Sequence, residues 1–231
     1  MKPTLFIAGD STAAIKGATE KPMTGWGEFL QGYFGTSLEV NNCAINGRST
    51  RSFVAEGRMA AILKEFKHGD YLFLQFGHND EKKEDPSRYT DPDTEYRDNL
   101  HEFITSARRL GGTPVLLTSV SRRRYLEDGT LDPNAVGAYP AAMREVAAAT
   151  QTPLLDIFAA SQLLCQDLGV EGSKAIFMHL PEGAHPNYPA GVEDNTHFSG
   201  EGAREIARLV AQAIEQSAGL SELQSMLLTN P

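Results

Sequence analysis

Short runs of apolar residues recur along the chain, and each gives way to a polar or glycine-rich segment. Five of these runs are predicted strands, at residues 5–8, 38–43, 71–76, 114–119 and 153–157. Several runs are nearly continuous rather than alternating, which is typical of parallel strands covered on both faces. The pattern therefore predicts a parallel sheet in the core of the protein.

Apolar residues between the strands recur at the spacing of a helix face. The predicted helices cover residues 52–66, 94–110, 141–149, 159–168 and 200–216. Gly111-Gly112 is suited to cap the second helix, and Gly169 to end the fourth. Strands that alternate with helices indicate right-handed βαβ crossovers and a three-layer α/β/α sandwich. The pattern alone leaves the order of the strands open.

Length and composition narrow the class of protein. The chain has 231 residues, of which 41% are hydrophobic, and this suits one core and one domain. We assign residues 1–220 to that domain and residues 221–231 to a C-terminal tail. The chain has no long uncharged apolar segment, so we expect no transmembrane helix. The first strand follows Met1 without a separate signal-peptide region, which favours a cytoplasmic protein.

Charge and cysteine content bear on partners and cofactors. The formal net charge of −9 argues against nucleic acids and anionic membranes as partners, because both require a cationic surface. An acidic substrate would have to be held by local arginines. Cys43 and Cys165 are interpreted as buried free thiols. The chain has no Cys-x-x-Cys pair, so we expect no structural zinc site. We also expect no cofactor. The oligomeric state is left open.

A serine follows the first predicted strand, in Gly9-Asp10-Ser11-Thr12. A strand that ends in a glycine turn is one way to hold a nucleophilic hydroxyl above the end of a sheet. On this motif alone, a turn or helix-cap role for Ser11 is the better interpretation, because it is the commoner role of serine after a strand. The other parts of an acyl-transfer site must therefore decide between the two interpretations.

Three later segments supply those parts. His197 is a candidate base for Ser11, and Asp194, three residues earlier, could orient the imidazole ring. Gly47, Asn79 and the backbone N–H of Ser11 could donate hydrogen bonds to an oxyanion. Turn and surface-loop roles remain alternatives for each residue on its own. Ser11, Gly47 and Asn79 each follow a predicted parallel strand, and because the carboxyl ends of such strands share one edge of the sheet, we expect the three residues to form one site.

Two alternative chemistries use other histidines. His78 is a competing base, although its place directly after a buried strand favours a packed histidine. A zinc site could be built from residues of one loop region and its flank, namely His179, His185, Asp194 and His197. Their spacing matches no common zinc motif, which makes the metal site the weaker hypothesis.

Taken together, the four segments resemble the marked sequence blocks of the SGNH (GDSL-type) hydrolase superfamily. In chain order they are Gly9-Asp10-Ser11-Thr12, residues 44–49 with Gly47, Gly77-His78-Asn79-Asp80 and Asp194-x-x-His197, and they span most of the chain. Within the superfamily, residues 46–50, 76–80 and 194–199 are most similar to rhamnogalacturonan acetylesterases. The serine lies in Gly-Asp-Ser rather than in a Gly-x-Ser-x-Gly elbow, which disfavours the ordinary α/β-hydrolase fold.

The resemblance implies both a fold and a mechanism. The fold is a five-stranded parallel flavodoxin-like sheet in the order 2-1-3-4-5. The resemblance makes Ser11 the nucleophile, His197 the base and Asp194 its orienting carboxylate, with Ser11, Gly47 and Asn79 as the oxyanion hole. The implied reaction is removal of O-acetyl groups from a pectic, rhamnogalacturonan-type oligosaccharide through an acyl-enzyme. A cytoplasmic enzyme that trims imported acetylated oligosaccharides would fit both this reaction and the expected location.

Substrate recognition is less well determined by the sequence. Candidate substrate-binding residues are Arg48, His78, Arg122, Arg123, Arg124 and His185. Guanidinium groups after the fourth strand could pair with uronate carboxylates, although a solvated charge run is an equally good interpretation. The segment 179–193 is expected to be a long irregular, substrate-facing loop that precedes Asp194.

Two other functions remain open at this point. The same catalytic residues could serve a GDSL-type lipase, lysophospholipase or thioesterase, which would need a long apolar channel. A non-enzymatic carbohydrate-binding protein on a retired hydrolase fold is the second alternative. The complete set of catalytic groups argues against the latter.

Overall fold

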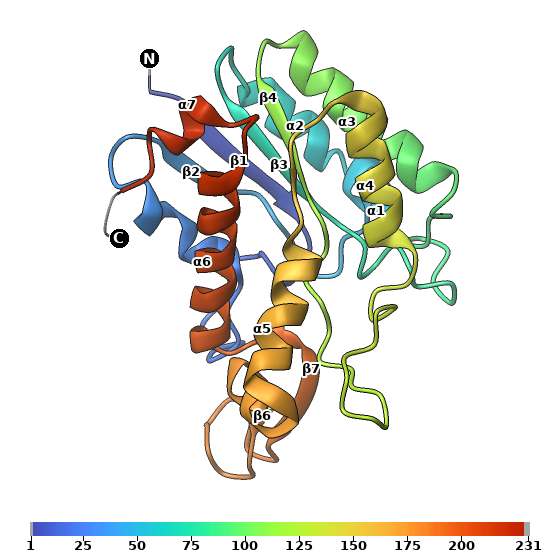
Figure 1. The fold of residues 1–231 in the computed structure, drawn as a ribbon, viewed down its shortest axis with the longest axis vertical. Coiled ribbons are helices and arrows are strands. Elements are labelled where there is room, and N and C mark those ends of the chain that lie inside the picture. The colour runs from blue at the N-terminus through green and yellow to red at the C-terminus, as the bar shows by residue number, and fades with distance from the viewer. Residues whose placement is uncertain (1, 229–231) are drawn as a thin grey trace.

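A computed structural model describes residues 2–228 of the chain. At its centre lies a five-stranded parallel sheet in the order β2-β1-β3-β4-β5, as the family resemblance implies (Figure 1). The strands are β1 (Thr4–Gly9), β2 (Glu39–Asn42), β3 (Tyr71–Gln75), β4 (Thr113–Leu117) and β5 (Leu154–Leu155). The fifth strand is shorter than the apolar run at 153–157 indicates, because Asp156 already caps the helix that follows.

Both faces of the sheet are covered by helices, which explains the continuous apolar runs. Leu5 and Ile7 of β1 point into one core, and Phe6 and Ala8 into the other. The first core is closed by α5 (Ile157–Gly172) and α6 (Gly200–Gln216), together with η1 (Trp26–Glu28) and η2 (Leu30–Tyr33). The second core is closed by α1 (Thr50–Ala55), α2 (Arg58–Glu65), α3 (Glu95–Arg109) and α4 (Tyr139–Thr150). The predicted three-layer sandwich is confirmed.

Two of the predicted helices differ from the structure at glycines. The single helix predicted at 52–66 is wrong, because the chain forms α1 and α2 with a break at Gly57, whose φ is 67°. A residue at positive φ cannot continue a right-handed helix, and glycine adopts that conformation at little cost. Gly169 interrupts α5 in the same way, with φ of 71°, and one further turn follows it to Gly172.

The largest difference from expectation lies between residues 177 and 198. After η3 (Ser173–Ile176), the chain forms an antiparallel hairpin of β6 (Phe177–Leu180) and β7 (Val192–Phe198), which is separate from the main sheet (Figure 1). Asp194 and His197, which we expected in a loop like the other candidate residues, lie instead on strand β7. Exposed and partly buried polar residues alternate along β7, so the strand lacks the apolar run that identifies the others.

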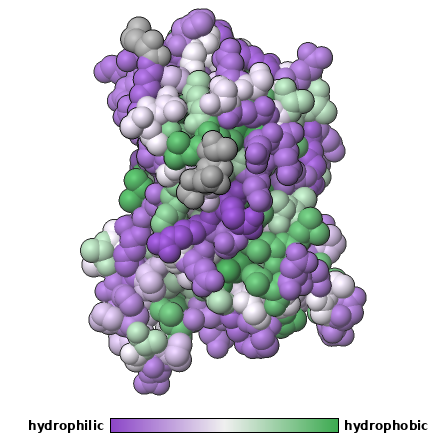
Figure 2. Space-filling model, turned by 60° about the vertical axis from the view of Figure 1, so that its left-hand side comes forward, coloured by the Kyte–Doolittle hydropathy of each residue, from purple (hydrophilic) through white to green (hydrophobic). Residues whose placement is uncertain are grey.

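The C-terminal part of the described chain packs on the domain. Helix α7 (Ser221–Gln224) brings Leu223 into the first core beside Leu220. The last three residues of the expected tail lie outside the described range. The face that carries α6 and α7 is largely hydrophilic, with separate hydrophobic patches (Figure 2). Between residues 2 and 228, no helix has the length and apolarity needed to cross a membrane. The domain boundary and the cytoplasmic location stay predictions.

Candidate active site

The turn after β1 presents Ser11 at the carboxyl edge of the sheet. Asp10 is fully buried, and its carbonyl oxygen accepts hydrogen bonds from the N–H groups of Ala13 and Ala14. The Asp10 carboxylate accepts two more, from the N–H and the hydroxyl of Thr12, at 2.9 and 2.8 Å. These bonds fix the turn from below and leave the Ser11 side chain partly exposed at its tip.

A chain of hydrogen bonds links Ser11 to the β6–β7 hairpin. The hydroxyl oxygen of Ser11 lies 2.8 Å from Nε2 of His197, and Nδ1 of His197 lies 2.7 Å from Oδ2 of Asp194. Because the carboxylate accepts the Nδ1 proton, Nε2 is left as the acceptor for the serine hydroxyl. The structure thus brings the three residues together in the order that an activated serine requires.

The electrostatics of Asp194 support that arrangement. Burial by itself raises the pKa of the Asp194 carboxyl, but hydrogen bonds from the His197 ring and from the N–H groups of His197 and Thr196 lower it to about 2. The carboxylate is therefore ionised at neutral pH. An ionised partner stabilises the imidazolium that forms when the ring takes a proton.

The hairpin that carries this pair is anchored at the C-terminal end and near the middle of β7. The carbonyl oxygen of Phe198 accepts a hydrogen bond from the N–H of Thr24, and the Phe198 ring packs on Phe177. Near the middle of the strand, the N–H of Arg123 donates to the carbonyl of Asn195 at 2.8 Å. The guanidinium of Arg122 donates to the hydroxyl of Thr196 at 3.2 Å. The loop after β4 therefore fixes His197 relative to the sheet.

Gly47 and Asn79 line the same cleft as Ser11 and His197. The loop that carries Gly47 is tied to β1, because the N–H of Ile45 donates a hydrogen bond to the carbonyl of Gly9.

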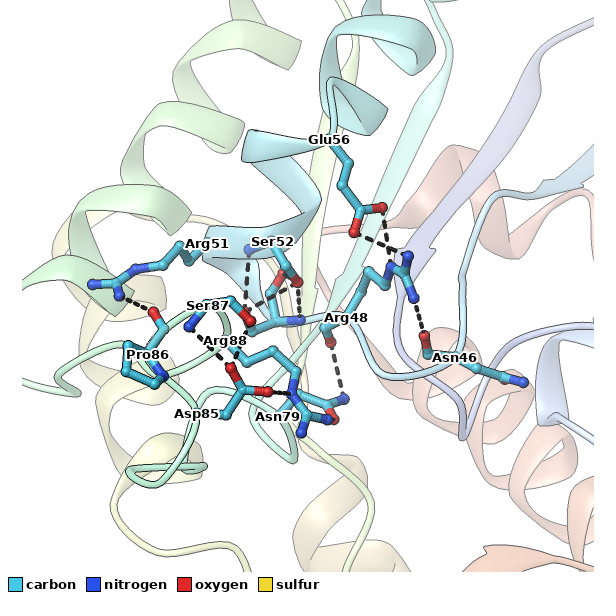
Figure 3. Close-up of polar contacts among 11 residues, drawn as sticks. Asn46, Arg48, Arg51, Ser52, Glu56, Asn79, Asp85, Pro86, Ser87 and Arg88 are labelled. Carbon is cyan, nitrogen blue, oxygen red and sulfur yellow. Dashed lines mark hydrogen bonds and ion pairs between the residues drawn. The ribbon is translucent and has the colours of Figure 1, made fainter.

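A turn at Gly77 positions Asn79 after β3. Gly77 has a φ of 147°, and a Cβ at this position would lie 2.2 Å from the Ser119 hydroxyl oxygen. Only glycine fits this turn, which delivers Asn79 to the sheet edge. The amide nitrogen of Asn79 donates to the carbonyl of Arg48 at 3.0 Å, leaving its second N–H unassigned (Figure 3).

The three consecutive arginines occupy very different environments. Arg123 is only 9% exposed, and its guanidinium donates to Ser173, Asn195 and the carbonyl of Val170. It does not line the cleft, so these contacts give no support to the expectation that Arg123 binds the substrate, and that role stays a prediction. Arg122 and Arg124 do line the cleft. Both are engaged within the protein, Arg122 with Glu81 and Arg124 with Asp132.

Other candidate substrate residues also have partners inside the protein. Arg48 pairs with Glu56 and donates to the carbonyl of Asn46, outside the cleft lining (Figure 3). His78 lines the cleft floor but is 3% exposed, with Nε2 2.8 Å from the carbonyl oxygen of Val120. Burial lowers the pKa of His78 to about 4, so the ring is neutral at neutral pH. His185 contacts the N–H of Asn187 in the hairpin loop and is not part of the cleft lining.

The zinc hypothesis depends on histidines that the fold keeps apart. His197 is bonded to Ser11 and Asp194, whereas His179 contacts the side-chain oxygen of Asn195 and His185 lies in the hairpin loop. In the described part of the chain, no three His, Cys, Asp or Glu side chains gather as a metal-binding group. The arrangement therefore gives this alternative no support.

The cleft above Ser11 has a volume of about 710 Å³ and a polar lining. Its lining residues are Ser11, Lys16, Glu20, Met23, Asn46, Gly47, His78, Asn79, Glu81, Lys82, Arg88, Arg122, Arg124, Thr196 and His197. Met23 is the one large apolar side chain in that set. Lysines and arginines outnumber acidic residues, so the cleft is locally cationic in a protein of net charge −9.

Lys16, Lys82 and Arg88 belong to this lining and were missed by the sequence analysis. Lys16 is 4% exposed, and its ammonium group donates to the carbonyl of Ser11 at 2.6 Å and to the side-chain oxygen of Asn46. Burial lowers the pKa of Lys16, while nearby carboxylates oppose the shift. Nothing in the local sequence distinguishes these cations from surface ones, because their roles come from contacts between separate loops.

The amino-acid sequence is similar to those of known esterases. Residues 7–205 match the model of the GDSL-like lipase/acylhydrolase family. The chain is 44% identical to the rhamnogalacturonan acetylesterase RhgT of Bacillus subtilis over 92% of its length and 89% of that protein. It is 38% identical to the probable rhamnogalacturonan acetylesterase YesY of the same organism, over 96% and 97% of the two chains.

Solved structures show the same architecture. The crystal structure of YxiM from Bacillus subtilis superposes with a TM-score of 0.79 at 25% identity, covering 94% of this chain and 57% of that one. The acetylxylan esterase Axe2 of Geobacillus stearothermophilus superposes with a TM-score of 0.65 at 18% identity, covering 92% and 96%. The second likeness concerns the fold alone.

Proposed function

Because the chain belongs to the GDSL-like lipase/acylhydrolase family, we propose that it is a serine esterase that removes O-acetyl groups from a pectic, rhamnogalacturonan-type oligosaccharide. The relatives of similar length that carry this activity in their names support the reaction class. The single observation that carries the mechanism is the hydrogen-bonded chain from Ser11 through His197 to Asp194, which opens into a polar cleft.

The first half of the proposed reaction forms an acetyl-enzyme. The hydroxyl oxygen of Ser11 attacks the acetyl carbonyl carbon while Nε2 of His197, 2.8 Å away, takes the hydroxyl proton. The carbonyl electron pair moves to the oxygen, which is stabilised by N–H groups of Ser11, Gly47 and Asn79. When the tetrahedral intermediate collapses, the bond to the sugar oxygen breaks, and His197 returns the proton to that oxygen.

The second half of the reaction releases acetate, with a water molecule as the nucleophile and Ser11 as the leaving group. Water attacks the acetyl-Ser11 carbonyl while His197 takes one of its protons, and the same N–H groups hold the oxyanion. Collapse breaks the bond to the Ser11 oxygen, and the proton passes back to it from His197. Asp194 stays ionised throughout, which its low pKa of about 2 favours.

The character of the cleft supports an acetylated sugar over a long acyl chain. A lipase or thioesterase needs apolar walls to bury methylene groups, each worth about 0.8 kcal/mol. Here the walls are amide, hydroxyl and charged groups, and Met23 is the one large apolar side chain among them. Such groups suit the hydroxyls of an oligosaccharide, and a short acetyl group needs little apolar space.

The cations of the cleft support a uronate-containing substrate. Among residues 2–228, most of these cations have protein partners, whereas the ammonium group of Lys82 makes neither an ion pair nor a hydrogen bond.

Lys82→Ala should raise KM for fragments that contain galacturonate roughly tenfold at low salt, because it removes the binding free energy of one charge-assisted hydrogen bond. Lys83→Ala, an exposed neighbour, is the matched control. Equal KM values for the two variants would exclude Lys82 as the carboxylate contact.

Acetate release tests the reaction itself. Purified protein is incubated with acetylated rhamnogalacturonan fragments, with acetylated xylan, and with p-nitrophenyl acetate, butyrate and octanoate. We expect the highest kcat/KM on the rhamnogalacturonan fragments and a steep fall from acetate to octanoate. Faster hydrolysis of octanoate would favour a lipase or thioesterase, and fragment binding without acetate release would favour a retired hydrolase fold.

A further inference from the structure

The side-chain amide of Asn79 is held at both of its ends (Figure 3). Its nitrogen donates to the carbonyl oxygen of Arg48 at 3.0 Å, and its oxygen accepts from Nη1 of Arg88 at 3.2 Å. Arg88 also lines the cleft beside Ser11. From this contact we propose that Arg88 is a positioning residue, which sets the orientation of the Asn79 amide and strengthens its N–H as an oxyanion donor. The inference rests on the proposed function, in which Asn79 is such a donor.

The contacts at the two ends permit only one orientation of the amide. If the amide were flipped, its NH2 group would face the guanidinium, which is also a donor, and its oxygen would face the carbonyl of Arg48, which is also an acceptor. In the observed orientation, the Arg48 carbonyl uses one N–H and the second stays available. The guanidinium of Arg88 thus favours the orientation of the Asn79 amide in which its second N–H is available as a donor in the cleft.

Arg88 itself is fixed by the turn in which it lies. Its Nε atom donates to Oδ2 of Asp85 at 2.6 Å (Figure 3). The Asp85 carbonyl accepts hydrogen bonds from the N–H groups of Arg88 and Tyr89. The other carboxylate oxygen of Asp85 accepts from the N–H and hydroxyl of Ser87. Hydrogen bonds from Ser87 and then Arg88 lower the pKa of Asp85. A planar guanidinium can bond Asp85 and Asn79 at once, which a lysine ammonium cannot match in geometry.

Arg88 places its positive charge beside two of the proposed oxyanion donors, the side-chain amide of Asn79 and the backbone N–H of Gly47. Nη1 of Arg88 lies 3.9 Å from the point where a Cβ on Gly47 would stand. A cation bonded to the amide oxygen draws electron density from the N–H, because hydrogen bonds in a chain polarise one another. Arg88 therefore acts through Asn79, without itself contacting the developing oxyanion.

A double-mutant cycle on p-nitrophenyl acetate, which has no carboxylate, tests the coupling. We expect kcat to fall about 100- to 1000-fold in Asn79→Ala. In Arg88→Ala it should fall about 10- to 100-fold, with little change in KM, because the donor is present but misplaced. Arg88→Lys should lie between Arg88→Ala and the unmodified enzyme. In the Asn79→Ala background, Arg88→Ala should add less than about threefold, because the two changes remove one interaction.

A control variant and a spectrum separate this inference from the proposed function. Arg97→Ala removes an arginine that pairs with Asp93 and Glu145, away from the cleft, and should leave kcat unchanged. In 1H–15N spectra, the Asn79 side-chain amide peak, identified by its loss in Asn79→Ala, should shift in Arg88→Ala and not in Arg97→Ala. A protein without esterase activity would refute the proposed function, while this shift would still report the contact.

Three results would overturn the role of Arg88. One is a kcat in Arg88→Ala within twofold of the unmodified enzyme. Another is additivity of the two substitutions, which would show that Arg88 and Asn79 act independently. The third is an effect confined to KM for uronate-containing fragments, which would make Arg88 a substrate contact.

Discussion

Ser11, Gly47 and Asn79 stand at the ends of strands in the central sheet, whereas Asp194 and His197 stand on a hairpin outside it. On the sheet side, β1 and β3 are buried on both faces, and their ladder of backbone hydrogen bonds fixes the loops that follow. On the hairpin side, β7 is partly exposed and is held by contacts with Thr24, Arg122 and Arg123. The nucleophile is therefore positioned by the core, and its base by a few specific bonds.

This difference predicts that the base can be displaced while the domain stays folded. A loss of the nucleophile removes the chemistry completely, and a change on the hairpin side alters proton transfer. Substitutions on each side should separate these effects.

The largest effect is expected for Ser11→Ala. The substitution removes the atom that attacks the acetyl carbon, so kcat should fall by several orders of magnitude, as in other serine triads. The melting temperature should stay within a few degrees, because the hydroxyl is at a partly exposed turn tip. Ser106→Ala on α3 is the matched control. If the Ser11 variant kept more than roughly a tenth of the activity, Ser11 could not be the nucleophile.

The next effect is expected on the hairpin side, for Asp194→Asn. An asparagine can no longer fix the Nδ1 proton of His197 or stabilise the imidazolium, and such a change costs roughly 10⁴-fold in kcat in a comparable triad. Glu193→Gln, on the exposed neighbour in β7, controls for the change of charge and should be nearly silent. Similar kcat values for the two variants would contradict the role of Asp194.

A smaller effect, on stability, is expected where the hairpin meets the loop after β4. Arg123→Met removes buried charge-assisted hydrogen bonds to Ser173 and Asn195, so the free energy of unfolding should fall by about 2–4 kcal/mol. Arg124→Met removes a half-exposed ion pair and should cost less than about 1 kcal/mol. Urea denaturation compares them. Equal stabilities, with KM raised in Arg123→Met, would restore Arg123 as a substrate contact.

A further effect, on the pH dependence of stability, concerns two carboxyls whose pKa values shift in opposite directions. Burial raises the pKa of Asp80 to about 7, in spite of hydrogen bonds from Thr50 and Thr90. The folded protein then keeps a proton that the unfolded chain releases near pH 4, so Asp80 makes stability fall as pH rises from about 4 to 7. Asp194, at about 2, contributes stability above pH 4 that is lost as pH falls toward 2.

Unfolding at a series of pH values in the asparagine variants checks these directions. Asp80→Asn should flatten the decline in the free energy of unfolding between pH 4 and 7. Asp194→Asn should flatten the loss below pH 4. A curve for Asp80→Asn parallel to that of the unmodified protein would show that Asp80 is ionised at low pH like an ordinary carboxyl.

The same contrast explains what could be predicted from the sequence. The site residues on the sheet side could be predicted, because apolar runs end at Gly9 and Gln75 and the carboxyl ends of parallel strands lie at one edge of the sheet. The hairpin could not, because β7 carries charged residues and no apolar run. Charge alone did not distinguish buried Arg123 from exposed Arg124. The contact from Arg88 to Asn79 depends on how an irregular loop folds back, which periodicity cannot show.

The most direct test of the account is covalent labelling by a reactive organophosphonate ester, followed by peptide mass analysis. We expect one adduct, on the peptide that contains Ser11, because within residues 2–228 only that hydroxyl is hydrogen-bonded to a histidine that a carboxylate orients. Labelling should be absent in Ser11→Ala and strongly slowed in His197→Ala. An adduct on another residue, or labelling of His197→Ala at the unmodified rate, would contradict the claim that the sheet and the hairpin together form the active site.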